Sequence, residues 1–218
     1  MNLVFPRLYA IIDPSLLTIS ELELAETLAG SGVELIQYRN KTASSRHFFE
    51  ISRQLSGALG ARGVRLIVND RADIAVLSGA GGVHVGQEDL GVEEARAICG
   101  GLGGFGGKDR WVGVSTHTLE QLAAADRTSA DYIALGPIFP TATKKNLDPV
   151  VGTELLRQAR RLTRKPLIAI GGITLDRAAE VYRAGADSLA VIRDLIAAPN
   201  PAVRAREYLD VAASATSR

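Results

Sequence analysis

Two carboxylates follow successive apolar runs of the chain. Asp70 follows the run 64–68 after Asn69, and Asp89 comes shortly after the run 82–85. If the fold brings the ends of these runs together, the two acids form a hard oxygen site. Such a site suits Mg²⁺, which keeps several waters and takes few protein carboxylates. The pair therefore predicts a magnesium site formed by Asp70 and Asp89.

The stretch "QYRNK" carries Gln37, Arg39 and Lys41 at the end of another apolar run. Residues two apart in an extended segment point to the same side, so all three donors share one direction. Arginine forks onto phosphate oxygens, and lysine supplies a point charge. Beside a metal site, this strip suits a pyrophosphate. The alternative is an incidentally charged, solvated strand end.

A second anion site is predicted from three later segments. The loop "GPIFPTATKKN" offers hydroxyls and a cation in Thr141, Thr143 and Lys144. The paired glycines Gly171-Gly172 let backbone N–H groups approach a ligand, and another apolar run ends at Ile192-Arg193. The alternative is that these glycines serve packing alone.

Other reactive residues are interpreted as structural. Ser115 and His117 point to one side of a predicted strand, but side chains two apart are rarely oriented for proton transfer, so acyl-transfer chemistry is not favoured. Ser115 is expected to be a hydrogen-bonding wall of the pocket, and His84 a satisfied core histidine. Asp13 precedes Pro14 and indicates a turn as readily as a site. Cys99 has no activating partner near it in sequence and is expected to be an incidental helix residue.

The elements that must position these residues alternate regularly. Eight continuous apolar runs predict buried parallel strands, and segments with helical spacing lie between them, several with a start signal such as Ser20 followed by Glu23. The predicted strands are 8–12, 33–38, 64–68, 82–85, 111–114, 132–135, 167–170 and 188–192, and the predicted helices are 20–29, 45–59, 90–98, 119–124, 152–162 and 176–184. Glycine-rich segments at 31–33, 62–64, 80–83 and 184–187 predict helix ends.

Eight strand–helix repeats with right-handed crossovers close most simply into an α/β fold of the (β/α)₈ or TIM-barrel type. All strands then end at one face, which explains the two acids. A doubly wound open sheet is the alternative. Residues 1–218 are expected to form a single barrel domain, with a frayed tail from about 211. The glycine-rich segment 100–108 is expected to be a loop before the fifth strand.

Composition narrows the class of protein. The 218 residues carry a formal charge of +1 and 46% hydrophobic residues. This balance gives no indication of nucleic-acid or membrane affinity. The single cysteine cannot form an internal disulfide, which fits a reducing compartment. With no leader-like segment and no apolar span, the sequence predicts a cytoplasmic protein.

The pattern resembles the thiamine phosphate synthase family over nearly the whole chain, from Tyr9 to Leu195. Several motifs stand in the same order, and together they are highly specific. They are Gln37–Lys41, Asn69-Asp70-Arg71, Gly82–Leu90, Gly113–His117, Ala130-Asp131-Tyr132, Gly136-Pro137, Thr141–Lys144 and Ala169–Ile173.

The resemblance implies an enzyme that couples hydroxymethylpyrimidine diphosphate to a thiazole phosphate and releases pyrophosphate. Its partners would be these small molecules, with no nucleic acid and no membrane, and a homo-oligomer is left open. By resemblance, Mg²⁺ would bind Asp70 and Asp89, with catalytic roles for Arg39, Lys41, Lys144 and Ser115. The pyrimidine diphosphate would be held by Gln37, Tyr38, Arg39, Asn40, Lys41, Asn69, Ser115 and Lys144, and the thiazole phosphate by Thr141, Ala142, Thr143, Gly171, Gly172, Ile192 and Arg193.

The chain departs from the family at Arg193, where a small serine is common. The guanidinium could add a phosphate contact or protrude into the pocket. Two other functions are weighed. A thiazole tautomerase of the same barrel family would use His117 and need no metal or diphosphate strip. A non-catalytic thiamine-precursor binding protein would have no use for leaving-group contacts.

Overall fold

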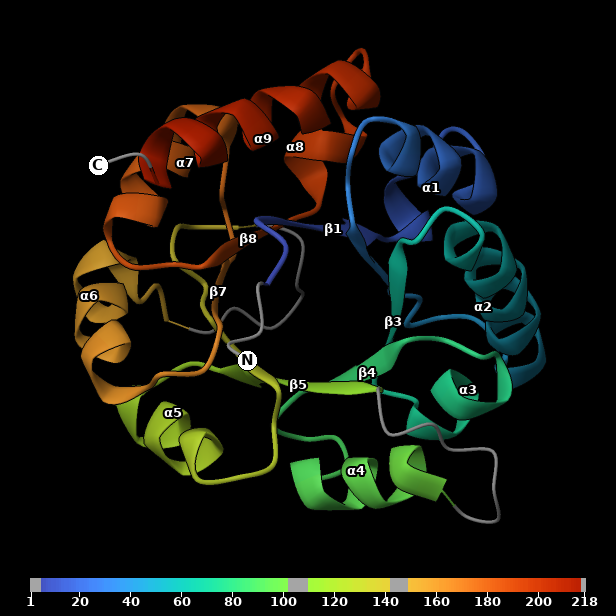
Figure 1. Ribbon diagram of the computed structural model, residues 1–218, viewed down its shortest axis with the longest axis horizontal. Coiled ribbons are helices and arrows are strands. Elements are labelled where there is room, and N and C mark those ends of the chain that lie inside the picture. Colours follow the sequence, from blue (N-terminus) through green and yellow to red (C-terminus); the bar gives the residue numbers. More distant parts are fainter. Residues whose placement is uncertain (1–4, 102–109, 142–148, 217–218) are drawn as a thin grey trace.

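Eight parallel strands form a closed ring in sequence order, and β1 pairs with β8 to complete it (Figure 1). The computed structural model describes residues 5–101, 110–141 and 149–216. The ring confirms the (β/α)₈ barrel and excludes the open sheet. The strands are β1 (Leu8–Ile12), β2 (Leu35–Tyr38), β3 (Arg65–Asn69), β4 (Gly82–Val85), β5 (Trp111–Thr116), β6 (Tyr132–Leu135), β7 (Leu167–Ile170) and β8 (Ser188–Val191).

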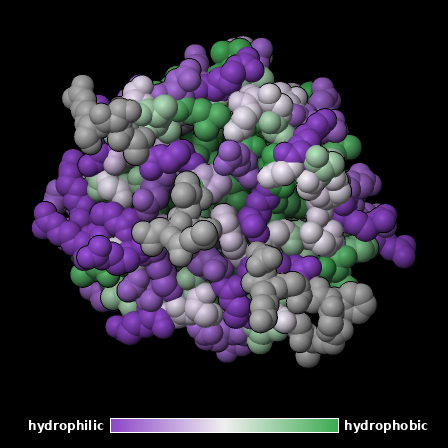
Figure 2. Space-filling view, in the orientation of Figure 1, coloured by the Kyte–Doolittle hydropathy of each residue, from purple (hydrophilic) through white to green (hydrophobic). Residues whose placement is uncertain are grey.

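Helices surround the ring, and Figure 2 shows hydrophilic residues over much of the visible face with small apolar groups between them. The predicted start signal at Ser20 is confirmed, because its side chain accepts a hydrogen bond from the Glu23 amide. The helices are α1 (Glu21–Gly30), α2 (Ser45–Gly60), α3 (Ala72–Leu77), α4 (Val92–Gly101), α5 (Leu119–Asp126), α6 (Gly152–Leu162), α7 (Leu175–Arg183), α8 (Arg193–Ile196) and α9 (Pro201–Thr216), with a 3₁₀ turn at Pro14–Leu16.

Helix ends are marked by glycines in the left-handed region, where a side chain would be strained. Gly32, Gly63 and Gly185 have positive φ as predicted. The exit before β4 differs, because the positive φ falls on Gly79, upstream of the predicted segment 80–83. Gly82 instead begins the strand, where a Cβ would lie 2.3 Å from the Trp111 carbonyl oxygen.

Two hydrophobic cores share the strands. The larger lies between strands and helices and includes Leu8, Ala10 and Ile12 of β1, whereas Tyr9 and Ile11 face the smaller core inside the barrel. Side chains thus alternate between the two cores, as in any barrel wall, although both sets are apolar. Within the barrel, Phe5 stacks on Trp111 with ring centroids 5.1 Å apart, and Tyr132 lies 5.0 Å from Phe5. These aromatic rings fill the barrel interior beneath the polar residues of the strand ends.

The C-terminal segment is more ordered than its small residues predicted. Helix α9 runs to Thr216 and packs against α1 and α7, with Ala205, Tyr208 and Ala212 buried. The prediction of a frayed tail from about 211 is corrected by this packing, since Ala212 lies beyond that point. Helix α4 likewise extends to Gly101, which takes in the first residues of the expected loop 100–108; the rest of that loop lies outside the described residues.

Cys99 is buried in α4, and burial raises the pKa of its thiol, which agrees with a structural residue. Among the helices of the described segments, none is long and apolar enough to cross a membrane.

Candidate active site

A cavity is lined by residues from the carboxyl-terminal parts of the strands and the loops that follow them. The end of each parallel strand reaches the same face, so the fold brings together side chains that are far apart in sequence. The predicted site residues that line this cavity are Gln37, Arg39, Asn69, Ser115, Thr141, Gly171, Ile192 and Arg193. The fold therefore brings these predicted residues to one cavity, whereas Lys41, Asp70 and Asp89 are not among the residues that line it.

Arg39 is held in place by Asp13. Its guanidinium donates a hydrogen bond of 2.5 Å to Asp13 Oδ2, and both side chains are largely buried. The other oxygen, Oδ1, accepts hydrogen bonds from the amide and hydroxyl of Ser15. Asp13 therefore serves both of the roles considered for it, because one carboxylate fixes the turn after β1 and orients a cation of the cavity.

Lys41, Asp70 and Asp89 form a charged group at the rim. The Lys41 ammonium donates to Asp70 Oδ2, and Asp89 Oδ2 accepts a hydrogen bond of 2.8 Å from the Gly86 amide. Burial raises the pKa of Asp70, with the nearby Asp89 adding to the effect and Lys41 opposing it. Two carboxylates from successive strand ends thus lie close together, and their ionised forms require cations.

The backbone of Asp70 is unusual. Its φ of +64° is the one positive value recorded for a non-glycine residue across the described segments. A hydrogen bond of 2.7 Å from the Asp70 amide to the His84 carbonyl oxygen ties this residue to β4. Left-handed conformations are tolerated by Asp and Asn but cost free energy. In this conformation the Asp70 carboxylate contacts the Lys41 ammonium.

The donor set at the rim fits a magnesium ion. No group of three or more His, Cys, Asp or Glu side chains suited to a metal occurs in the described part of the chain. Asp70 and Asp89 alone offer two hard oxygen ligands at the rim, and a magnesium ion held by them would take its remaining ligands from water and substrate oxygens. This is the usual balance for Mg²⁺, whereas structural zinc sites need four protein ligands.

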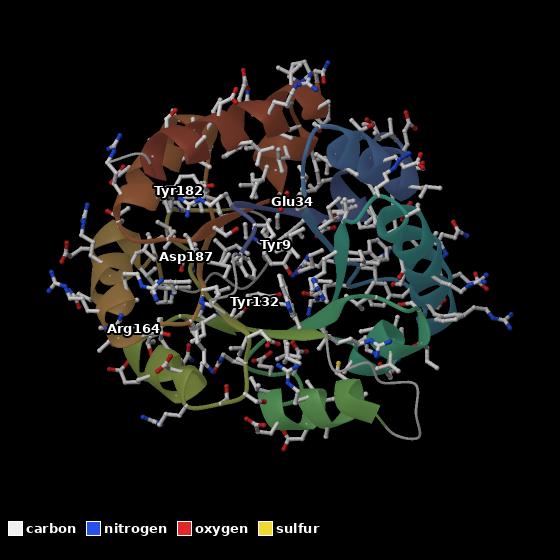
Figure 3. The ribbon with its side chains drawn as sticks, in the orientation of Figure 1. Tyr9, Glu34, Tyr132, Arg164, Tyr182 and Asp187 are labelled. Atoms are coloured by element: carbon white, nitrogen blue, oxygen red, sulfur yellow. The ribbon has the colours of Figure 1, made fainter. Side chains whose placement is uncertain are left out.

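A chain of hydrogen bonds crosses the cavity floor. Gln37 Nε2 lies 2.7 Å from the Tyr9 hydroxyl, which lies 2.9 Å from the Tyr132 hydroxyl. Tyr132 lies 3.1 Å from His84 Nδ1, and His84 Nε2 lies 2.9 Å from Ser115 Oγ. His84 is buried and satisfied, as predicted, and it also lines the cavity. Figure 3 shows Tyr9 and Tyr132 together near the centre of the ring.

Gly113 makes room for this floor. A Cβ there would lie 2.0 Å from the Tyr132 ring, so any other residue would displace the phenol. The Tyr132 ring also stacks on the His84 imidazole, with centroids 5.5 Å apart. The glycine in the strand is thus explained by a close packing contact.

His117 is a separate feature of the cavity wall. Its Nδ1 lies 2.6 Å from the Gly136 carbonyl oxygen and donates a hydrogen bond to it. Ser115 is paired with His84 instead. The Ser115 hydroxyl lies 2.9 Å from His84 Nε2, so its recorded histidine partner is not the one weighed in the sequence.

A second cavity adjoins the first and shares Thr141 and Arg193 with it. Gly172 and Arg177 also line it, and Arg177 lies over the Phe139 ring at 4.5 Å. A Cβ on Gly172, whose φ is +64°, would lie 2.5 Å from the Pro140 carbonyl oxygen. Arg177, Arg193 and Arg204 line this space with Thr141 and one acid, Asp194, which pairs with Arg204. The excess of cations suits an anion.

Some predicted site residues lie elsewhere. Tyr38 is fully buried in the outer core, where its ring packs 5.1 Å from Phe48, and Asn40 braces the following loop by accepting hydrogen bonds from the Thr42 and Ala43 amides. Neither lines the two cavities. Ala142, Thr143 and Lys144 lie outside the described residues.

Sequence reasoning missed Tyr9, Tyr132 and the pairing of Asp13 with Arg39. Within each strand the side chains of both faces are apolar, so the sequence shows no polar alternation that would separate the inward tyrosines from the outward residues. The available signal was that alternate residues of a strand face the same side of the barrel wall. Tyr9 faces inward with Ile11, and Tyr132 faces inward with Ala134.

Comparisons with known proteins give a consistent result. The family described as "Thiamine monophosphate synthase" matches residues 8–195. A thiamine-phosphate synthase of Koribacter versatilis is 48% identical over 217 residues, covering 96% of this chain and 97% of that protein. One of Methanospirillum hungatei is 37% identical and covers 94% of this chain and 96% of that protein. The solved thiamine phosphate pyrophosphorylase of Pyrococcus furiosus superposes with a TM-score of 0.85 at 30% identity and covers 97% of each chain.

Proposed function

The chain belongs to the thiamine monophosphate synthase family, whose members are transferases of thiamine biosynthesis, and we propose that its barrel mouth joins hydroxymethylpyrimidine diphosphate to a thiazole phosphate with Mg²⁺. The observation that carries this proposal is the placement of Arg39, Lys41, Asp70 and Asp89 at one end of the barrel. These residues supply cations and metal ligands where a diphosphate would depart.

The reaction breaks the bond between the methylene carbon of the pyrimidine and the diphosphate oxygen, and the diphosphate leaves with the bonding electrons. The thiazole nitrogen then forms the new bond to that carbon. No proton has to be removed, so the site needs leaving-group stabilisation and alignment more than a general base. The resemblance to the family implies a pyrimidine-methyl cation between the two steps.

Each group of residues has a role in this proposal. Arg39, oriented by Asp13, holds diphosphate oxygens, and Lys41 contributes a second cation. Asp70 and Asp89 would hold Mg²⁺, which supplies Lewis-acid stabilisation of charge on the leaving group. Gln37 and Ser115 lie deeper, beside the floor tyrosines, and contact the pyrimidine ring. We assign Gln37 to the ring end on this ground, although the sequence suggested the diphosphate.

The second cavity is proposed to hold the thiazole phosphate. Thr141 and Arg193 lie between the two cavities, where the two substrates would meet. Arg177 and the Gly172 backbone supply further contacts to the phosphate. Lys144, by resemblance, completes the diphosphate site from the adjoining loop.

Release of pyrophosphate from the two purified precursors tests the proposal. We expect release with Mg²⁺, none with excess chelator, and turnover lowered by orders of magnitude in Asp70→Ala and Lys144→Ala. His117→Ala serves as the comparison and should retain turnover. Absence of pyrophosphate release from the wild-type protein, or release that persists in both Asp70→Ala and Lys144→Ala, would contradict the proposed site. Tautomerisation of the thiazole substrate that is lost in His117→Ala would favour the tautomerase.

A further inference from the structure

Five side chains from five strands form one continuous hydrogen-bonded chain across the cavity floor. In order, they are Gln37, Tyr9, Tyr132, His84 and Ser115. The two ends of the chain, Gln37 and Ser115, line the cavity on strands β2 and β5, which are not neighbours in the ring. The middle of the chain is buried. The hydrogen-bonding roles of the two ends are therefore linked through buried groups.

The donor and the acceptor in each of these hydrogen bonds follow from the number of protons on each group. Burial raises the pKa of Tyr9 and of Tyr132, so each phenol remains neutral with one proton to donate. Gln37 Nε2 is a donor, and the Tyr9 oxygen accepts from it. Tyr9 then donates to Tyr132, and Tyr132 donates to His84 Nδ1.

The far end is fixed by the same logic. Because His84 Nδ1 accepts a hydrogen bond, its imidazole is neutral and carries its proton on Nε2. That proton is donated to Ser115 Oγ. The Ser115 hydroxyl proton is then left to point into the cavity, and for it no acceptor is recorded in the described part of the chain. The Gln37 amide oxygen, likewise with no recorded partner among the described residues, faces the cavity as an acceptor.

We propose that Tyr9, Tyr132 and His84 are positioning residues that fix Ser115 as a hydrogen-bond donor and Gln37 as an acceptor, and so select an amino-substituted ring. This inference rests on the proposed function and deepens it by naming the buried residues that orient the contacts to the pyrimidine ring. A flat ring between the two groups would present an exocyclic amine to Gln37 and an unprotonated ring nitrogen to Ser115. The apolar cavity wall of Ile11, Ala134 and Ile170 suits the faces of such a ring.

An oxo-substituted ring would meet the opposite pattern. Its carbonyl oxygen would face the Gln37 oxygen, and its ring N–H would face the Ser115 proton. Turning the Gln37 amide over would help only if every bond in the chain reversed, ending with His84 protonated on Nδ1. This hydrogen-bonded series, called the relay below, therefore couples the contact that Gln37 makes with the ring to the contact that Ser115 makes with it. A mismatch would leave buried polar groups unpaired.

The proton position of His84 gives a direct test. In protein labelled with ¹⁵N-histidine, long-range ¹H–¹⁵N spectra distinguish the two neutral tautomers and the imidazolium. The chain holds three histidines, so His47→Gln and His117→Gln assign the signals. We expect the Nε2–H tautomer for His84 in the free protein. An Nδ1–H tautomer or an imidazolium would overturn the inference.

Removal of a single hydroxyl tests the coupling. Tyr132→Phe keeps the ring that packs on Phe5 but releases His84 Nδ1, so we expect a mixture of tautomers. The matched control is Tyr182→Phe, because Tyr182 donates to the Arg7 carbonyl oxygen and lines neither of the two cavities (Figure 3). Tyr9→Phe, which uncouples Gln37, provides a second variant. An unchanged His84 spectrum in Tyr132→Phe would contradict the relay.

Calorimetric binding of two probes, with Mg²⁺ present, measures the consequence. They are the 4-aminopyrimidine diphosphate and its 4-oxo counterpart. We expect wild type and Tyr182→Phe to prefer the amino ring by about 100-fold or more, and Tyr132→Phe and Tyr9→Phe to lose at least about tenfold of that preference. An equal preference in all four proteins would overturn the inference. Absence of pyrophosphate release from either ring would instead count against the proposed function, while the His84 spectrum would still report the relay.

Discussion

The Lys41 ammonium donates a hydrogen bond to the Asp70 carboxylate, so a cation after β2 partly neutralises an acid after β3. Lys41 is half exposed, whereas Asp70 is largely covered. The pair joins the two functions proposed for the rim, because a metal on Asp70 would free Lys41 to contact a diphosphate. Four predictions concern this rim and the two cavities.

The stability of the protein should depend on the ionisation of Asp70. Because burial raises the pKa of Asp70, its contribution to stability is fully present below the ordinary aspartate pKa of about 3.9 and is lost as pH rises through the folded-state pKa. Asp70→Asn is neutral at every pH and tolerates the positive φ. We expect its free energy of unfolding, relative to wild type, to increase from pH 4 to pH 7 in urea titrations. A relative decrease would contradict the assigned direction.

Magnesium should stabilise the fold through the same carboxylates. At a free concentration about tenfold above its dissociation constant, Mg²⁺ should add about 1.4 kcal/mol to the free energy of unfolding. Asp70→Asn or Asp89→Asn should abolish the gain. Asp73→Asn is the control, since Asp73 pairs with Arg71 outside the site. The midpoint of thermal unfolding with and without Mg²⁺ measures the effect, and an equal gain in all variants would rule out this metal site.

Replacing Asp13 should weaken both the fold and the diphosphate site. Asp13→Asn keeps an acceptor for Ser15 but removes the charge that pairs with Arg39. We expect a loss of about 1–3 kcal/mol in the free energy of unfolding and a higher KM for the pyrimidine diphosphate. Ser15→Ala, which leaves the ion pair intact, should change KM little. If the two variants had the same KM, Asp13 would not be positioning Arg39.

Arg193 should act on the thiazole phosphate. It lines both cavities, and its guanidinium can fork onto phosphate oxygens. Arg193→Ser should raise the KM for the thiazole phosphate about tenfold, the equivalent of about 1.4 kcal/mol, and leave the KM for the diphosphate unchanged. Arg183→Ser, at an exposed position on α7, is the control. A fall in the thiazole KM would show that the arginine obstructs the site.

The fold was accessible from the sequence because the strands are short continuous apolar runs separated by glycine-marked helix ends. Helix α3 escaped prediction because its six residues are too few for a clear period. Helix α9 escaped because its small residues resemble a solvated tail, yet Ala212 is buried by packing on distant helices. Such packing is a tertiary effect that local composition does not reveal.

The charged rim was predictable, whereas the floor of the site was not. Asp70 and Asp89 stand within a few residues of the ends of apolar runs, so the strand ends identify them. The hydrogen bond between the Tyr9 and Tyr132 hydroxyls joins residues 123 positions apart. In the sequence, neither tyrosine is distinguishable from a core aromatic residue. Only closure of the ring brings their hydroxyls together and shows that His84 is bonded to Ser115 instead of standing alone in the core.

Phe5 stacks on Trp111, and the Tyr132 ring lies tilted against Phe5 and edge-on to Trp111, so the three rings close the barrel interior at that end. Ligands would then enter and leave the barrel interior at its other end, where Arg39 and Arg193 line the cavity. A ligand bound against the floor would enter before, and leave after, any ligand that covers it from the opening. By closing the opposite end, the three aromatic rings would set the order in which substrates bind and products leave, an order that the polar residues alone would not set.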